Sequence, residues 1–198
     1  MTPIVRILLI ANALMFLASM GSGAPLLQWL ALWPPALLAP ADLDAPSFFP
    51  WQMLTYAFLH GSVLHLALNM YALWMFGSRL EAVWGPRRFA FYYFSCVLGA
   101  ALTQTLVSEW SLLSGAPAYP VIGASGGVFG LLLAYGLMFP NTMLMLLIPP
   151  MPVKAKWYAL GYGVVELLAG CTGSSVGVAH FAHLGGMLAG WVMLRARF

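Results

Sequence analysis

A serine set among glycines is the first residue whose type and surroundings could carry chemistry. Ser125 lies in the segment Gly-Ala-Ser-Gly-Gly-Val-Phe-Gly, residues 123–130, at the head of an apolar run that ends at Pro140. Small residues allow two membrane helices to pack closely. Glycines also let a substrate approach a hydroxyl, and a helix N-terminus offers unpaired N–H groups to a developing oxyanion. The segment alone leaves helix packing and a nucleophilic serine both open.

Few other strongly polar side chains fall within the apolar runs: His60, His65, Asn69, Glu166, His180 and His183. His65 and Asn69 are four residues apart, and His180 and His183 are three apart, so each pair shares one face of a helix. Ionisable groups within a membrane are costly and usually face a partner or a water-filled cavity. These residues are therefore candidates for one polar site.

The composition predicts an integral membrane protein. Of 198 residues, 62% are hydrophobic and only 7% are charged, and the mean hydropathy is +0.89. Soluble domains carry about 25% charged residues. Cys96 and Cys171 both lie in apolar runs and suggest neither a disulfide framework nor a metal site. The net charge of +3 is better explained by cytoplasmic anchoring charges than by nucleic acid. We expect no cofactor, no metal and no nucleic-acid partner.

The apolar runs predict the fold class, an all-α membrane bundle in a single domain over residues 1–198. Its six transmembrane helices are expected at about 4–20, 53–76, 89–107, 121–139, 157–168 and 178–194. The proline-rich loop 21–50 is typical of an interfacial segment.

The basic residues support six spans. With that count all of them fall on one side of the membrane: Arg6, Arg79, Arg87, Arg88, Lys154, Lys156, Arg195 and Arg197. The positive-inside rule makes this side, with both termini, cytoplasmic. Asp42, Asp44 and Glu109 fall on the opposite side.

The predicted spans bring Ser125 and His183 to the same depth. Ser125 lies about four residues into its span and His183 about five into a parallel one, roughly 6–8 Å below the helix starts. A hydroxyl and an imidazole at one level suit a nucleophile and its base. Gly126-xxx-Gly130 and Gly186-xxx-Gly190 would allow these two helices to pack closely.

Taken together, these motifs resemble the rhomboid family of intramembrane serine proteases. The matching pieces are His60-Gly-Ser-Val-Leu-His65-Leu-Ala-Leu-Asn69, Gly77-Ser-Arg-Leu-Glu81-Ala-Val-Trp-Gly85, Gly123-Ala-Ser125-Gly and Ala182-His183-Leu-Gly-Gly186-xxx-Gly190. The resemblance implies a six-helix bundle that holds a Ser–His dyad in a cavity open to the outside. It covers the chain from about Trp51 to the C-terminus.

The resemblance also assigns roles to individual residues. Ser125 matches the nucleophile and His183 the general base. His65 and Asn69 match the residues that stabilise the oxyanion with the Ser125 backbone N–H. The expected supporting residues are Gly123, Gly126, Phe129 and Gly186.

Three further positions are informative. Glu81 matches a carboxylate that holds the turn between spans 2 and 3. Trp51 matches the first residue of a Trp-Arg pair, but Gln52 follows it here, which puts the contacts of that arginine in doubt. Phe129 falls where some members have a tyrosine beneath the histidine.

The expected site is a dyad without a third carboxylate. Glu166 is the only acid in spans 5 and 6. It is interpreted as structural or protonated, since a lone buried carboxylate tends to neutralise. His180, nearer the outer surface than His183, is expected to be a polar neighbour at the cavity mouth.

The predicted function is endoproteolysis of transmembrane segments of other membrane proteins. The expected setting is a bacterial inner membrane, with the site open to the extracytoplasmic side and membrane lipids around the chain. A rhomboid-like, non-catalytic binding module is the alternative. A small transporter is less favoured, because the polar groups gather toward one side of the membrane and no inverted repeat is evident.

Overall fold

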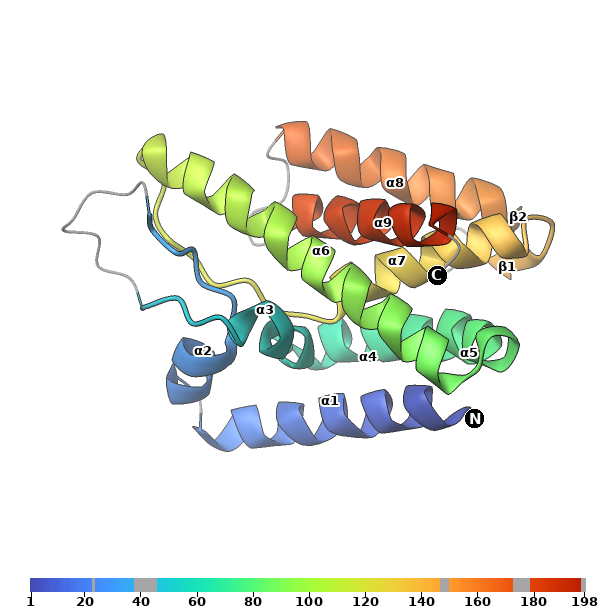
Figure 1. Ribbon diagram of the computed structural model, residues 1–198, viewed down its shortest axis with the longest axis horizontal. Coiled ribbons are helices and arrows are strands. Elements are labelled where there is room, and N and C mark those ends of the chain that lie inside the picture. Colours follow the sequence, from blue (N-terminus) through green and yellow to red (C-terminus); the bar gives the residue numbers. More distant parts are fainter. Residues whose placement is uncertain (23, 38–45, 147–149, 173–178, 197–198) are drawn as a thin grey trace.

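The computed structural model of the chain describes residues 1–22, 24–37, 46–146, 150–172 and 179–196, most of which are helical (Figure 1). Asp42 and Asp44 and part of the predicted interfacial loop lie outside the described residues. The helices are α1 (Pro3–Ser22), α2 (Ala24–Leu30), α3 (Gln52–Thr55), η1 (Tyr56–Phe58), α4 (Val63–Ala72), the π-helical η2 (Leu73–Gly77), α5 (Ser78–Trp84), α6 (Pro86–Leu113), α7 (Ser125–Met138), α8 (Ala155–Thr172) and α9 (His180–Arg195). A short antiparallel hairpin, β1 (Met143–Met145) and β2 (Pro152–Lys154), joins α7 to α8, with Leu144 opposite Val153.

Five of the six predicted spans fall on α1, α6, α7, α8 and α9, within a few residues at most ends. α6 is longer than predicted at both ends, running from residue 86 to 113 rather than 89 to 107. α7 begins at Ser125 rather than at 121, because Val121 pairs with Leu32 through two backbone hydrogen bonds of 2.9 and 3.0 Å.

The predicted span 53–76 is wrong at both ends. The chain leaves the short helices α3 and η1 in an extended conformation at Leu59, and α4 starts only at Val63. Ser62 caps this start by accepting a hydrogen bond from the backbone N–H of His65 at 3.1 Å. The helix then continues through η2 and α5 to Trp84, where Gly85 ends it at a positive φ of 80°.

In the described part of the chain, two helices are long and apolar enough to cross a membrane, Pro3–Gly21 and Pro86–Leu113. Ser125–Met138 is apolar but shorter. The number of membrane crossings and the orientation of the termini therefore remain predictions, whereas the helical fold class is confirmed.

α6, α7 and α9 form the packed centre of the bundle, and α8 lies along α7 and α9 (Figure 1). Glycines permit the closest approaches. A Cβ on Gly99 of α6 would collide with Ala189 of α9, and one on Gly130 of α7 would collide with Cys96 of α6. Packing at this density determines the separation of the helices that carry the polar residues.

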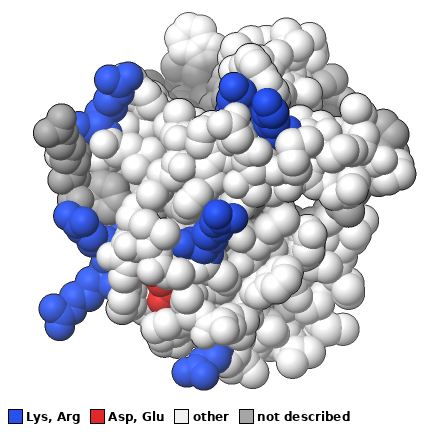
Figure 2. All heavy atoms as spheres, turned by 90° about the vertical axis from the view of Figure 1, so that its right-hand side faces the viewer, with Lys and Arg blue, Asp and Glu red and all other residues white. Residues whose placement is uncertain are grey.

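The basic side chains gather at one end of the molecule. Figure 2 shows Lys and Arg on the face where α5, the hairpin and both chain termini lie in Figure 1. Arg197 is outside the described residues. Glu109 lies toward the opposite end of α6, where it accepts a hydrogen bond from the backbone N–H of Ala36 at 2.5 Å. The positive-inside rule predicts that this basic end faces the cytoplasm, and the orientation stays a prediction.

Candidate active site

Ser125 is the first residue of α7, and an extended segment leads the chain into it. The backbone N–H of Gly123 donates to the carbonyl of Tyr56 at 2.9 Å. Gly123 has φ of +124°, and a Cβ there would lie 2.8 Å from Nε2 of His65. Both facts require glycine. The first N–H groups of α7 have no acceptor within the helix and lie beside the Ser125 hydroxyl.

His183 on α9 contacts Ser125 directly. Its Nε2 lies 2.7 Å from Oγ of Ser125, although 58 residues separate the two in sequence. The ring stacks on Phe129, with centroids 4.3 Å apart and planes 4° from parallel. Phe129, the residue predicted to support this ring, therefore lies flat against it.

Two glycines bring α7 and α9 close enough for that contact. A Cβ on Gly186 would overlap the backbone carbonyl of Gly126. A Cβ on Gly126 would in turn collide with Ala100 of α6. The small-residue faces predicted from sequence therefore meet, and helix packing and a reactive serine turn out to be compatible explanations of one segment.

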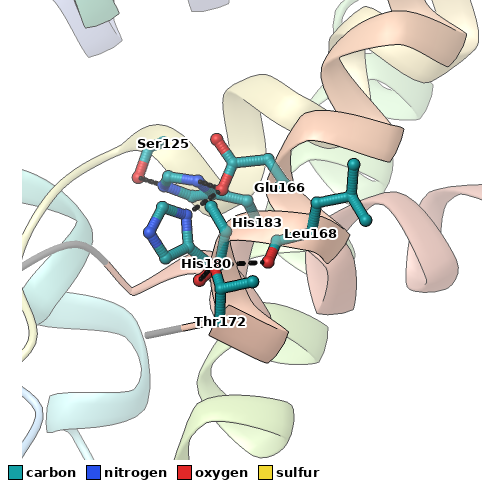
Figure 3. A network of polar contacts seen from close by, with 7 residues as sticks. Ser125, Glu166, Leu168, Thr172, His180 and His183 are labelled. Atoms are coloured by element: carbon teal, nitrogen blue, oxygen red, sulfur yellow. Dashed lines mark hydrogen bonds and ion pairs between the residues drawn. The ribbon is translucent and has the colours of Figure 1, made fainter. Parts of the chain in front are cut away.

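Glu166 on α8 contradicts the expectation that no carboxylate approaches the histidine. Its Oε2 lies 2.9 Å from Nδ1 of His183 and 2.7 Å from Nδ1 of His180 (Figure 3). The contact with His180 is an aligned hydrogen bond. The contact with His183 is close, but it is not an aligned hydrogen bond, because the oxygen lies off the Nδ1–H direction. All three side chains belong to residues that are only 8% exposed.

His180 also differs from its predicted place at the cavity mouth. It is buried, and its hydrogen bond goes to Glu166. The sequence offered a signal for this cluster in the single acid of the fifth span and the two histidines of the sixth. It offered no sign that they would meet.

A cavity of about 490 Å³ opens beside Ser125 and His183. His65 and Asn69 of α4 line it together with Glu166, several apolar side chains of α4 and α7, and two tyrosines of α8. Asn69 is buried, and its Nδ2 donates to the backbone carbonyl of His65 at 3.0 Å, which leaves the second N–H of that amide for another acceptor. The four residues predicted for the site thus share one cavity.

The same cluster has the composition of a possible metal site. One ligand atom each from Glu166, His180 and His183 lies within 4.8 Å of the others. Carboxylate and imidazole groups at this spacing suit a divalent cation such as Zn²⁺. Their mutual contacts account for the arrangement without an ion.

Gln52 and Tyr56 position the site from a distance, and sequence reasoning did not assign them this role. Gln52 is fully buried, accepts from the backbone N–H of Trp33 at 3.3 Å and donates to the carbonyl of Gln28 at 3.1 Å. It ties the first loop to α3. Tyr56 donates from its hydroxyl to the carbonyl of Val97 at 2.8 Å and so anchors the segment that holds Gly123.

Glu81 has a different structural role from the one expected. Its two oxygens accept hydrogen bonds from the backbone N–H groups of Ile4 and Val5, at 2.8 and 2.9 Å. The carboxylate therefore holds the N-terminus of α1 against α5, where a negative charge also suits the helix dipole.

This arrangement defines a class: a helical membrane protein in which a serine and a histidine are in contact beside a polar-lined cavity. The family model described as the rhomboid domain matches residues 48–198. The chain belongs to the rhomboid family, a family of integral membrane proteins that includes proteases.

Curated relatives agree with this membership. The chain is 36% identical over 146 residues to rhomboid protein 1, mitochondrial, of Saccharomyces cerevisiae, which covers 71% of this chain and 41% of that protein. It is 32% identical over 138 residues to the human presenilin-associated rhomboid-like protein, mitochondrial, covering 70% of this chain and 35% of that protein. Rhomboid protease GluP of Bacillus subtilis is 34% identical over 82 residues, which is 41% of this chain and 14% of that protein.

The chain therefore spans about two fifths or less of the length of these relatives. Two of the three are mitochondrial proteins. The predicted assignment to a bacterial inner membrane is therefore not supported, whereas the assignment to a membrane is.

Proposed function

We propose that this chain is an intramembrane serine endopeptidase that cleaves transmembrane segments of other membrane proteins. The observation that carries the proposal is the 2.7 Å contact between Oγ of Ser125 and Nε2 of His183 at the wall of the cavity. In this reading Ser125 is the nucleophile and His183 the general base.

The reaction would begin when Oγ of Ser125 attacks the scissile carbonyl and its proton passes to Nε2 of His183. The developing oxyanion would lie near the N-terminus of α7, where the first backbone N–H groups have no helical acceptor. His65 and the free N–H of Asn69 line the same cavity and would share this charge. His183 would then return the proton to the leaving amine.

The cavity favours an extended, apolar substrate segment. Its walls carry apolar side chains such as Leu68, Met75 and Leu132 beside the polar cluster. A backbone held in a helix has its polar groups satisfied and resists attack. The substrate class that fits is therefore a transmembrane segment whose end can unwind into the cavity. In this proposal the rhomboid chain itself crosses the membrane six times, and its basic end faces the cytoplasm or the equivalent compartment.

Fluorophosphonate labelling tests this function. The detergent-solubilised protein should form a covalent adduct on Ser125, identified by mass spectrometry of the digested chain. Ser125→Ala and His183→Ala should each reduce labelling by at least about a thousandfold, because nucleophile and base act as a unit. The same two variants should lose cleavage of a fluorogenic transmembrane peptide to a similar extent. A folded protein that neither labels nor cleaves would instead favour the non-catalytic binding module.

A further inference from the structure

We propose that Glu166 is a positioning residue for His183, so that the site works as a Ser125–His183–Glu166 relay rather than as a dyad. The inference rests on the proposed function. The carboxylate is on α8, whereas the serine and the histidine are on α7 and α9. Three helices would then contribute one residue each.

The ring of His183 is held between an acid and a hydroxyl. Nδ1 lies 2.9 Å from Oε2 of Glu166, and Nε2 lies 2.7 Å from Oγ of Ser125. In the described part of the chain, Glu166 is the one ionisable group in contact with Nδ1. Phe129 covers one face of the ring, so the carboxylate supplies the polar restraint and the phenyl group the apolar one.

The carboxylate also selects the tautomer of His183. An ionised carboxylate is an acceptor only, so the nitrogen that faces it carries the hydrogen. With the hydrogen on Nδ1, Nε2 presents a lone pair to the Ser125 hydroxyl. This is the tautomer that a general base needs. Without the carboxylate, the ring could equally place its hydrogen on Nε2 and donate to Oγ, which would leave the serine without a base.

His180 holds the carboxylate in place from the other side. Its Nδ1 is 2.7 Å from the same Oε2 in an aligned hydrogen bond, one helical turn before His183 (Figure 3). Oε1 of Glu166 remains available, so a small rotation of the carboxylate would give each ring its own oxygen. Hydrogen bonds of a catalytic site often tighten only when charge develops. An imidazolium at His183 would provide that charge.

The proton balance is simple. The Oγ–H bond of Ser125 breaks, its proton forms a bond to Nε2 of His183, and Oγ bonds to the electrophile. With a fluorophosphonate, the new bond is Oγ–P and fluoride leaves. The hydrogen on Nδ1 stays on His183, and Glu166 stays ionised throughout.

Labelling kinetics of E166Q with a fluorophosphonate test the proposal in the full chain. We expect the rate constant at saturating probe to fall about 10- to 100-fold, the loss that one hydrogen bond to a charged group provides. The half-saturating probe concentration and the melting temperature should change little. E166D, which keeps the charge on a shorter side chain, should restore part of the rate.

Thr172→Val is the matched control on α8. Among the described residues, the hydroxyl of Thr172 donates only to carbonyls of its own helix, at 2.9 Å to Leu168 and 3.4 Å to Ala169. This variant should label at the wild-type rate. The double variant E166Q/H183A should label no more slowly than H183A alone, because Glu166 acts through His183.

The outcomes separate the two proposals. E166Q that labels at the wild-type rate, with Ser125→Ala unlabelled, would overturn the relay and leave the protease function intact. Continued labelling of Ser125→Ala would overturn the function itself. Nitrogen NMR of the histidine-labelled wild-type protein gives a test that needs no altered Glu166. Among the four histidines, His183 should carry its hydrogen on Nδ1. The Nε2–H tautomer at His183 would refute the relay.

Discussion

Replacing Gly186 by alanine should separate the two helices that carry Ser125 and His183. An alanine Cβ at 186 would overlap the carbonyl oxygen of Gly126 and lie 2.7 Å from its carbonyl carbon. Non-bonded carbons rest at about 3.5–4.0 Å. The carbon pair alone therefore requires α9 to move away from α7 by about 1 Å. Both partners are backbone atoms, so no side-chain rotation can relieve the overlap.

That displacement would act directly on the site, because Gly126 adjoins Ser125 and Gly186 lies one turn beyond His183. The Nε2–Oγ separation of 2.7 Å would grow to about 3.7 Å, outside the range of a hydrogen bond. A misplacement of about 1 Å can cost about a hundredfold in rate. Overpacking typically also costs about 1–3 kcal/mol of unfolding free energy.

The assay compares fluorophosphonate labelling rate and thermal unfolding for Gly186→Ala and for the control Gly161→Ala. Gly161 lies in α8, and a Cβ there would meet nothing within 4 Å. The control should label normally and be as stable as wild type or up to about 1 kcal/mol more so. Wild-type labelling and stability in Gly186→Ala would refute the close approach of α7 and α9. Lost stability with normal labelling would show that helix separation does not determine the reactive contact.

Two further predictions follow from the contacts of α4 and α5. Asn69→Ala should lower the saturating rate of peptide cleavage by up to about 10²-fold with little change in KM. The loss is limited because Asn69 would share the charge of the oxyanion with His65 and backbone donors. Unchanged cleavage rates in both Asn69→Ala and His65→Ala would show that α4 is not part of the site. Glu81→Gln should lower the unfolding free energy by about 1–3 kcal/mol, because only one amide oxygen remains for the N–H groups of Ile4 and Val5. Chemical denaturation in detergent measures this loss, and the labelling rate per folded molecule should equal that of the wild type. An unaltered denaturation midpoint would argue against the role of Glu81 as a cap of α1.

Much of the site was predictable because its residues belong to local patterns. Helical spacing places His65 with Asn69 on one face, and glycine spacing marks the faces on which two helices can approach. Matched depth then relates Ser125 to His183, which are 58 positions apart in the sequence. The membrane class follows from composition, since only 7% of the residues are charged, and the long apolar runs then predict helices.

Other features depend on contacts that no local pattern encodes. The helix predicted to start at 53 begins only at Val63, because the chain is extended at Leu59 and Ser62 caps a new helix start. Hydropathy registers the apolar run but not this cap. Glu81 reaches the start of α1 across 76 residues of sequence. Its partners are two backbone N–H groups, which have no signature in the sequence.

Glu166 is the clearest case. It is 17 positions from His183 in the chain, on a helix that runs in the opposite direction, and its own neighbours in α8 are apolar. Helical periodicity assigns it a face but not a partner, because the rotation and depth of α8 against α9 follow from packing such as the close approach of the Phe181 ring to the backbone of Gly170. Only the folded arrangement brings one carboxylate oxygen within 2.9 Å of both imidazoles. In the relay proposed above, that proximity decides which nitrogen of His183 carries the hydrogen.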